Sequence, residues 1–72
     1  MTKLLRPKYT NSQIKELIQE YIHDEDSRKM LFLRLVNGRS FREIGEVVGR
    51  DEKTVRKRIR DGETILFEHL PG

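Results

Sequence analysis

The residues with the clearest chemical potential lie between positions 50 and 60. In "RDEKTVRKRIR", six lysine or arginine side chains stand against two acids. Such side chains neutralise phosphate, so a cluster of them is either a solvated helix face or the electrostatic footprint of a nucleic-acid-binding surface. The elements that position this cluster decide between the two interpretations.

Residues for catalysis or metal binding are not grouped in this way. The only histidines, His23 and His69, have no second ligand at metal spacing, and no Ser/His/Asp arrangement or glycine-rich phosphate loop occurs. Glu43 and Glu46 fit a helix cap and a surface position better than a catalytic pair. We therefore expect a protein that is not an enzyme and has no catalytic residues, no metal site and no cofactor.

Composition limits the size and environment of the fold. A chain of 72 residues forms one small domain with a thin core. It has no cysteine, and no apolar run approaches the ~20 residues that cross a bilayer. We expect a soluble, cytoplasmic protein without membrane contact. The net charge of +3 is modest, so its distribution is more informative than its size.

The basic residues near the N-terminus precede the first predicted helix. Lys3, Arg6 and Lys8 lie in "MTKLLRPKYT" with no acid nearby. We predict a flexible basic arm over residues 1–9, followed by a single domain over residues 10–72. The arm is either a solubilising tail or a segment that reaches the phosphate backbone or the adjacent minor groove of DNA.

The first two helices are predicted from caps and periodicity. Thr10 and Gln13 form a capping box, and an amphipathic stripe follows it, so we predict a helix over 11–23. The second, over 25–37, contains "MLFLRLV" at 30–36, whose apolar side chains surround a helix and suit a central position. A buried strand with a hairpin turn at Asn37 and Gly38 is the alternative, but no partner strand with period two exists.

The third and fourth helices are predicted over 40–48 and 51–69. Ser40 and Glu43 form a second capping box, and Gly49 has the position of a left-handed C-cap. Asp51 caps the fourth helix. Its apolar or small positions are Val55, Ile59, Gly62 and Leu66. The fold class is all-α, a small four-helix domain.

Two helices joined by a short glycine-bearing turn indicate a helix-turn-helix, whose second helix enters the DNA major groove. Gly45 lies where these helices cross, so Leu there should be destabilising, whereas Ala should be tolerated or mildly stabilising. At 3.6 residues per turn, one basic face lies opposite Val55 and Ile59. This face consists of Lys53, Arg56, Lys57 and Arg60.

The segment "DSRKMLFLRLVNGRSFREIGEVVGRDEKTVRKRIRDGETIL" resembles region 4 of the bacterial sigma-70 family, which reads the −35 promoter element. Its most specific parts, "SFREIGEVVG" and "TVRKRI", are similar to the family patterns Ser-aromatic-x-Glu-Ile-Ala-x-x-x-Gly and Thr-Val-x-x-Arg-Leu. The resemblance implies contacts with bases and phosphates from Asp51, Glu52, Lys53, Arg56, Lys57 and Arg60. We expect the DNA-contacting set to include Arg39, Ser40, Arg50 and Thr54 as well.

Three residues depart from the family pattern. Gly45 stands where Ala is usual, and Gly62 interrupts the fourth helix, which we expect to bend or fray there. Arg50 replaces an apolar residue that is usual in the turn. This change either weakens the packing of the turn against the core or adds a phosphate contact.

The resemblance also implies a function and partners. We expect a stand-alone, sequence-specific DNA-binding transcription regulator of the small phage or mobile-element type, because 72 residues leave no room for the other regions of a sigma factor. Its partners would be double-stranded DNA and the β flap of RNA polymerase. The alternatives are a recombination or excision accessory protein, and a module that binds the flap with little DNA affinity. The apolar tail residues Ile65, Phe67 and Leu70 either complete the core or pair two protomers as a homodimer.

Overall fold

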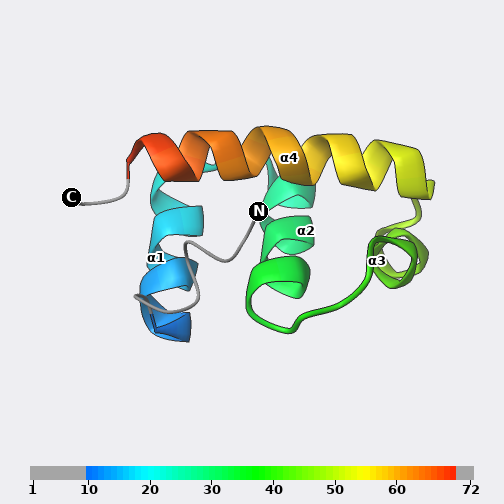
Figure 1. The fold of residues 1–72 in the computed structure, drawn as a ribbon, viewed down its shortest axis with the longest axis horizontal. Coiled ribbons are helices and arrows are strands. Elements are labelled where there is room, and N and C mark those ends of the chain that lie inside the picture. The colour runs from blue at the N-terminus through cyan, green and yellow to red at the C-terminus, as the bar shows by residue number, and fades with distance from the viewer. Residues whose placement is uncertain (1–9, 70–72) are drawn as a thin grey trace.

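The computed structural model describes residues 10–69, and the predicted arm over residues 1–9 lies outside this part. The described part folds into four α-helices without a strand, shown in Figure 1. They are α1 (Asn11–Tyr21), α2 (Glu25–Leu35), α3 (Phe41–Val48) and α4 (Glu52–Glu68). The predicted all-α, four-helix architecture is confirmed. The alternative of a strand at 30–36 is wrong, because residues 30–35 belong to α2 and Val36 is its C-cap.

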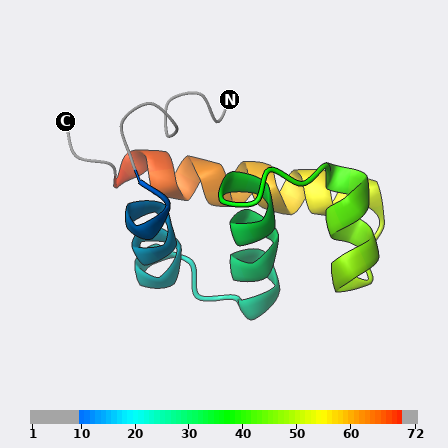
Figure 2. The same cartoon turned by 90° about the horizontal axis from the view of Figure 1, so that it is seen from below.

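The long helix α4 lies across the other three. Helices α1, α2 and α3 stand side by side beneath it, each crosswise to its axis, as Figures 1 and 2 show from two directions. Helix α2 occupies the middle and contacts all three other helices. The molecule is therefore elongated along α4, with principal extents of 34 × 22 × 18 Å.

The helix starts follow the predicted caps. The hydroxyl of Thr10 accepts a hydrogen bond from the backbone N–H of Gln13 at 3.2 Å, and the side chain of Gln13 accepts one from the backbone N–H of Thr10 at 2.9 Å. Ser40 and Glu43 make the same reciprocal pair at 3.1 and 3.0 Å. Both capping boxes satisfy N–H groups that the first helical turn leaves without partners. Both were predicted correctly.

The helix ends differ from the predicted ones by up to two residues. Helix α1 ends at Tyr21 because Ile22 is extended, with φ −109° and ψ 115°. Helix α2 ends at Leu35, two residues early, and Gly38 then takes a left-handed φ of 68°. Residues 40, 51 and 69 are caps that flank α3 and α4. The predicted ranges therefore counted some capping residues as helical.

The core is a single apolar cluster to which every helix contributes. Its members are Ile14, Ile18, Ile22, Met30, Leu31, Leu35, Ile44, Val55, Ile59 and Leu66. Met30 and Leu31 of α2 are fully buried, which confirms the predicted central position of this helix. No helix within residues 10–69 has both the length and the apolar character needed to span a membrane.

Gly62 is a packing position rather than a break in α4. The helix continues through it to Glu68, and Gly62 is buried. A Cβ atom there would lie 2.6 Å from Cδ1 of Leu31, so the missing side chain lets α4 approach α2. The expectation that α4 bends or frays at this glycine is wrong, because close helix packing outweighs the low helix propensity of glycine.

Arg28 joins the first two helices at the end of α1. Its guanidinium donates hydrogen bonds to the backbone carbonyls of Ile22 and of Gln19, the latter at 2.8 Å. The last carbonyl groups of a helix have no partner within the helix, so a side chain from α2 supplies one here. This contact orients α1 beside the N-terminal half of α2.

Candidate nucleic-acid interface

The turn between α3 and α4 is closed by backbone hydrogen bonds. The carbonyl oxygen of Gly45 accepts from the N–H of Gly49 at 2.9 Å and from the N–H of Arg50 at 3.0 Å. Gly49 has a φ of 74°, the left-handed conformation predicted for it. Val55, in the first turn of α4, is fully buried. The turn and this anchor together fix where the second helix of the pair begins.

The close packing at Gly45 leaves no room for any side chain. A Cβ atom there would lie 2.5 Å from the carbonyl oxygen of Arg50 and 3.6 Å from Cγ2 of Val55. The prediction that helices α3 and α4 meet at this glycine is confirmed. The expectation that alanine is tolerated there is wrong, because the obstacle is the backbone of the turn and not a side chain that can rotate.

The four residues of the predicted basic face lie on the outer side of α4. Lys53, Arg56, Lys57 and Arg60 are all exposed. The opposite side of the helix is anchored by Val55 and Ile59, of which at most 2% is exposed. The structure thus brings the four cations together on one surface. Their contact with DNA stays a prediction.

Arg56 is held more closely than its neighbours. Its Nη2 donates to Oε2 of Glu52, one turn earlier in α4, at 3.0 Å. Its guanidinium also lies 5.4 Å from the centroid of the Phe41 ring at the start of α3. Arg34 of α2 approaches the same ring at 4.3 Å, and its Nη1 donates to the carbonyl of Arg39 at 2.9 Å. Three helices therefore meet at Phe41.

Sequence reasoning missed the roles of Phe41 and Arg34. Phe41 has the spacing of an apolar position of α3, and Arg34 is the polar residue of the run at 30–36. Cation–π contacts join residues that are distant in sequence, so periodicity within one helix gives no sign of them.

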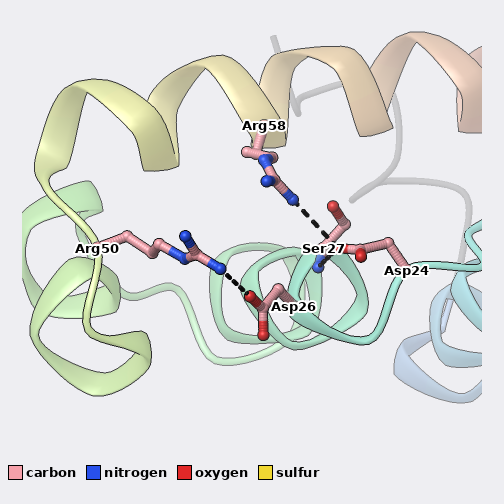
Figure 3. Close-up of polar contacts among 5 residues, drawn as sticks. All are labelled: Asp24, Asp26, Ser27, Arg50 and Arg58. Carbon is pink, nitrogen blue, oxygen red and sulfur yellow. Dashed lines mark hydrogen bonds and ion pairs between the residues drawn. The ribbon is translucent and has the colours of Figure 1, made fainter.

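Two further arginines of the basic segment are tied to α2, as Figure 3 shows. Arg50 in the turn donates to Oδ2 of Asp26 at 2.6 Å. Arg58 of α4 donates to Oδ2 of Asp24 at 3.2 Å, and the same carboxylate accepts from the N–H of Ser27 at 2.9 Å. The predicted role of Arg50 was to weaken the packing of the turn between α3 and α4 or to contact phosphate. It forms an ion pair with the N-terminus of α2.

Arg58 was not among the predicted site residues, although a signal for its position exists. It follows Val55 by three residues and precedes Ile59, which puts it at the edge of the buried stripe of α4. The acidic block at 24–26 offers carboxylates to a cation in such a position. Together these features indicate an arginine that reaches toward α2, although its side chain remains 39% exposed.

Hydrogen bonds shift the pKa of several groups at these helix ends. The backbone N–H and side chain of Ser27, followed by the charge of Arg58, lower the pKa of Asp24. The backbone N–H of Ser40 lowers the pKa of Glu43 in the same way. The hydrogen bond with Asp26 raises the pKa of Arg50 above its ordinary value. Each of these shifts favours the ionised form of its group.

The remaining predicted residues lie around the start of α3 and α4. Asp51 occupies the N-cap position but makes no side-chain cap hydrogen bond. Its Oδ1 accepts from the hydroxyl of Thr54 at 2.6 Å, and this bond lowers the pKa of Asp51. The prediction that Asp51 is the N-cap residue of α4 is confirmed. Ser40 is the N-cap of α3, and Arg39 is exposed beside it.

Other predicted surfaces lie apart from this interface. Lys3, Arg6, Lys8 and Leu70 lie outside the described residues. In the tail, Phe67 packs against the core, while Ile65 is 39% exposed. Pairing of two protomers through this tail stays a prediction.

The two closely packed helices, the glycine turn and the outward basic face define a helix-turn-helix of the DNA-binding class. The sequence matches the family described as sigma-70, region 4, over residues 24–65. This match spans α2, α3 and most of α4, more than half of the 72-residue chain. The chain therefore belongs to the sigma-70 region 4 family, and the predicted resemblance is confirmed. Neither a curated protein nor a solved structure matches the chain.

The geometry at Gly45 predicts the effect of a single methyl group. Gly45→Ala should lower the free energy of unfolding by about 1–3 kcal/mol, the range for overpacking, although alanine favours a helix. Thermal unfolding followed by circular dichroism measures this change. Gly62→Ala is the matched control and should lower stability less, since its neighbour is the side chain of Leu31. A Gly45→Ala variant as stable as the wild type would contradict the tight turn.

The lowered pKa of Asp24 predicts a dependence of stability on acid. A folded pKa below the unfolded value means that ionised Asp24 stabilises the fold above about pH 4, and that this contribution disappears as the pH falls through the folded pKa. Asp24→Asn should therefore lower the melting temperature at neutral pH and flatten its decline between neutral and acidic pH. Melting curves at a series of pH values measure both.

Glu63 provides a control, because its pKa is shifted in the direction opposite to that of Asp24. Burial of this half-buried carboxyl raises its pKa, so its ionised form destabilises the fold at neutral pH. Glu63→Gln should raise the melting temperature at neutral pH. If Asp24→Asn and Glu63→Gln shift the melting temperature in the same direction, the assigned causes of these two pKa shifts are wrong.

Proposed function

We propose that this protein is a sequence-specific transcription regulator that inserts α4 into the major groove of double-stranded DNA. The observation that carries the proposal is the division of α4 into two faces. Val55 and Ile59 fix its inner face in the core, and four cations cover its outer face. A helix held in this way presents its first turns to base edges, while its charges meet phosphate.

Two acidic residues at the start of α4 favour sequence-specific binding of DNA over non-specific binding. Asp51 and Glu52 are exposed at the start of α4, where they repel phosphate. Carboxylates can accept a hydrogen bond from N4 of cytosine, so these residues favour some base pairs while they weaken contact with the backbone. Arg50 and Arg58 are engaged with α2, so the remaining positive charge of the segment is directed outward.

Binding of the RNA polymerase β flap stays a prediction from the family resemblance. A regulator that acts with polymerase should retain core polymerase in a pull-down and also enrich a −35-like sequence from a random pool of duplexes. An excision-type accessory protein should bind DNA without polymerase. An interaction module should bind polymerase with little affinity for DNA.

The outer face predicts a change in salt dependence. Replacing Lys57 and Arg60 with alanine should make the slope of log affinity against log salt less steep, by about 0.9 for each phosphate that is no longer neutralised. Titration of a fluorescent duplex at several salt concentrations measures this slope.

Arg58→Ala is the matched control, since it removes one arginine from the same helix but on the side that faces Asp24. Its effect on the slope should be much smaller than that of Arg60→Ala. Equal effects of Arg58→Ala and Arg60→Ala would mean that the outer face of α4 is not the contact surface.

A further inference from the structure

Arg50 has a fixed backbone and a side chain that is held by an exposed ion pair. Its backbone N–H donates to the carbonyl oxygen of Gly45 at 3.0 Å within the closed turn. The side chain extends from the turn toward α2, where Nη2 donates to Oδ2 of Asp26 at 2.6 Å (Figure 3). The side chains of Arg50 and Asp26 remain 44% and 43% exposed. The guanidinium is therefore paired without being buried, and another anion can reach it.

The start of α2 favours a negative charge that can hold this guanidinium. Asp26 lies in the first turn of α2, where the helix dipole stabilises a carboxylate. The hydrogen bond with Asp26, together with the charges of Asp26 and Asp24, raises the pKa of Arg50. Two carboxylates therefore attract the same cation, as a phosphate group of DNA would.

The place of Arg50 in the chain puts it beside the proposed DNA-binding surface. It follows the glycine turn and directly precedes Asp51, the N-cap of α4. Arg58, which is also paired with α2, instead extends from the inner flank of α4 beside the buried Ile59. Loss of its partner would not bring Arg58 to the outer face of α4. Loss of Asp26 would leave Arg50 unpaired next to the first turn of α4.

We propose that Asp26 limits the affinity of this protein for DNA, because its carboxylate competes with the phosphate backbone for Arg50. The proposal rests on the proposed function and adds to it a competitor within the protein itself. In the wild type, Arg50 stays on Asp26 and neutralises no phosphate. Phosphate contacts carry no sequence information, so this competition weakens the binding of every duplex by the same factor.

The test measures the affinity for two labelled duplexes, one enriched by the wild type from a random pool and one of arbitrary sequence, at several salt concentrations. Asp26→Asn removes the competing charge and keeps the size of the side chain. Arg50 should then neutralise one more phosphate, so the slope of log affinity against log salt should become steeper by about 0.9. Since an exposed ion pair shifts an equilibrium by at most about 5-fold, the affinity at low salt should rise about 2- to 5-fold, equally for both duplexes.

A second substitution identifies Arg50 as the source of this gain. Arg50→Ala alone should leave the slope almost unchanged, because Arg50 contacts no phosphate while Asp26 holds it. Added to Asp26→Asn, the same substitution should return the slope to the wild-type value. A gain that persists in the double variant would mean that Asp26 acts through overall charge, and the proposal would be overturned.

Glu25→Gln is the matched control for the change in net charge. Glu25 precedes Asp26 in the same turn of α2, and within residues 10–69 it forms no ion pair. Its substitution should change the slope much less than Asp26→Asn does. Circular dichroism checks that each variant keeps the helix content and melting temperature of a folded chain.

Two further results separate this proposal from the proposed function. Equal slopes for Glu25→Gln and Asp26→Asn, or weaker binding by a folded Asp26→Asn variant, would overturn the role of Asp26 while DNA binding stands. A wild-type chain that binds no duplex would overturn the proposed function, and the role of Asp26 with it.

Discussion

The close approach of Gly45 to the carbonyl oxygen of Arg50 is the constraint on which the position of α4 depends. A Cβ atom at residue 45 would lie 2.5 Å from this oxygen, so the turn reaches its present geometry only with glycine. The carbonyl of the same glycine accepts hydrogen bonds from the N–H groups of Gly49 and Arg50. Because the turn is closed by backbone atoms, α4 starts at a fixed place relative to α3, and Val55 and Ile59 then enter the core.

The position of α4 in turn sorts the charges of the basic segment. Arg50 and Arg58 face the acidic start of α2, where Asp26 and Asp24 accept their hydrogen bonds. These pairs are exposed and contribute little to stability. These pairs instead decide where the positive charge lies. They hold two arginines against α2, so the cations that remain available to phosphate and bases are those on the outer face of α4. The electrostatic surface of the domain follows from how its helices cross.

Features set by neighbouring residues could be predicted from the sequence. The four helices, both capping boxes and the left-handed Gly49 depend on contacts within three or four positions, which periodicity and cap rules describe. The outward basic face of α4 follows from the same periodicity. Helix ends were less accurate, since the C-cap residues Ile22 and Val36 are apolar and continue the pattern of α1 and α2 beyond the helix.

Features set by distant residues could not be predicted in this way. The ion pairs of Arg50 and Arg58 join residues 24 and 34 positions apart, and they depend on how α2 packs beneath α4. The low helix propensity of Gly62 predicts a break in α4, yet Leu31 of another helix occupies the space beside this glycine. The meeting of Arg34 and Arg56 at Phe41 also requires three helices in place.

We propose that the outer face of α4 enters the major groove of DNA. A titration of the isotope-labelled chain with an enriched duplex, followed by amide chemical shifts, tests it most directly. The largest shifts should fall on residues 51–60 and on the start of α3, and residues of α1 should change little. Shifts that concentrate on α1 and the adjacent surface of α2, with α4 unaffected, would contradict this account.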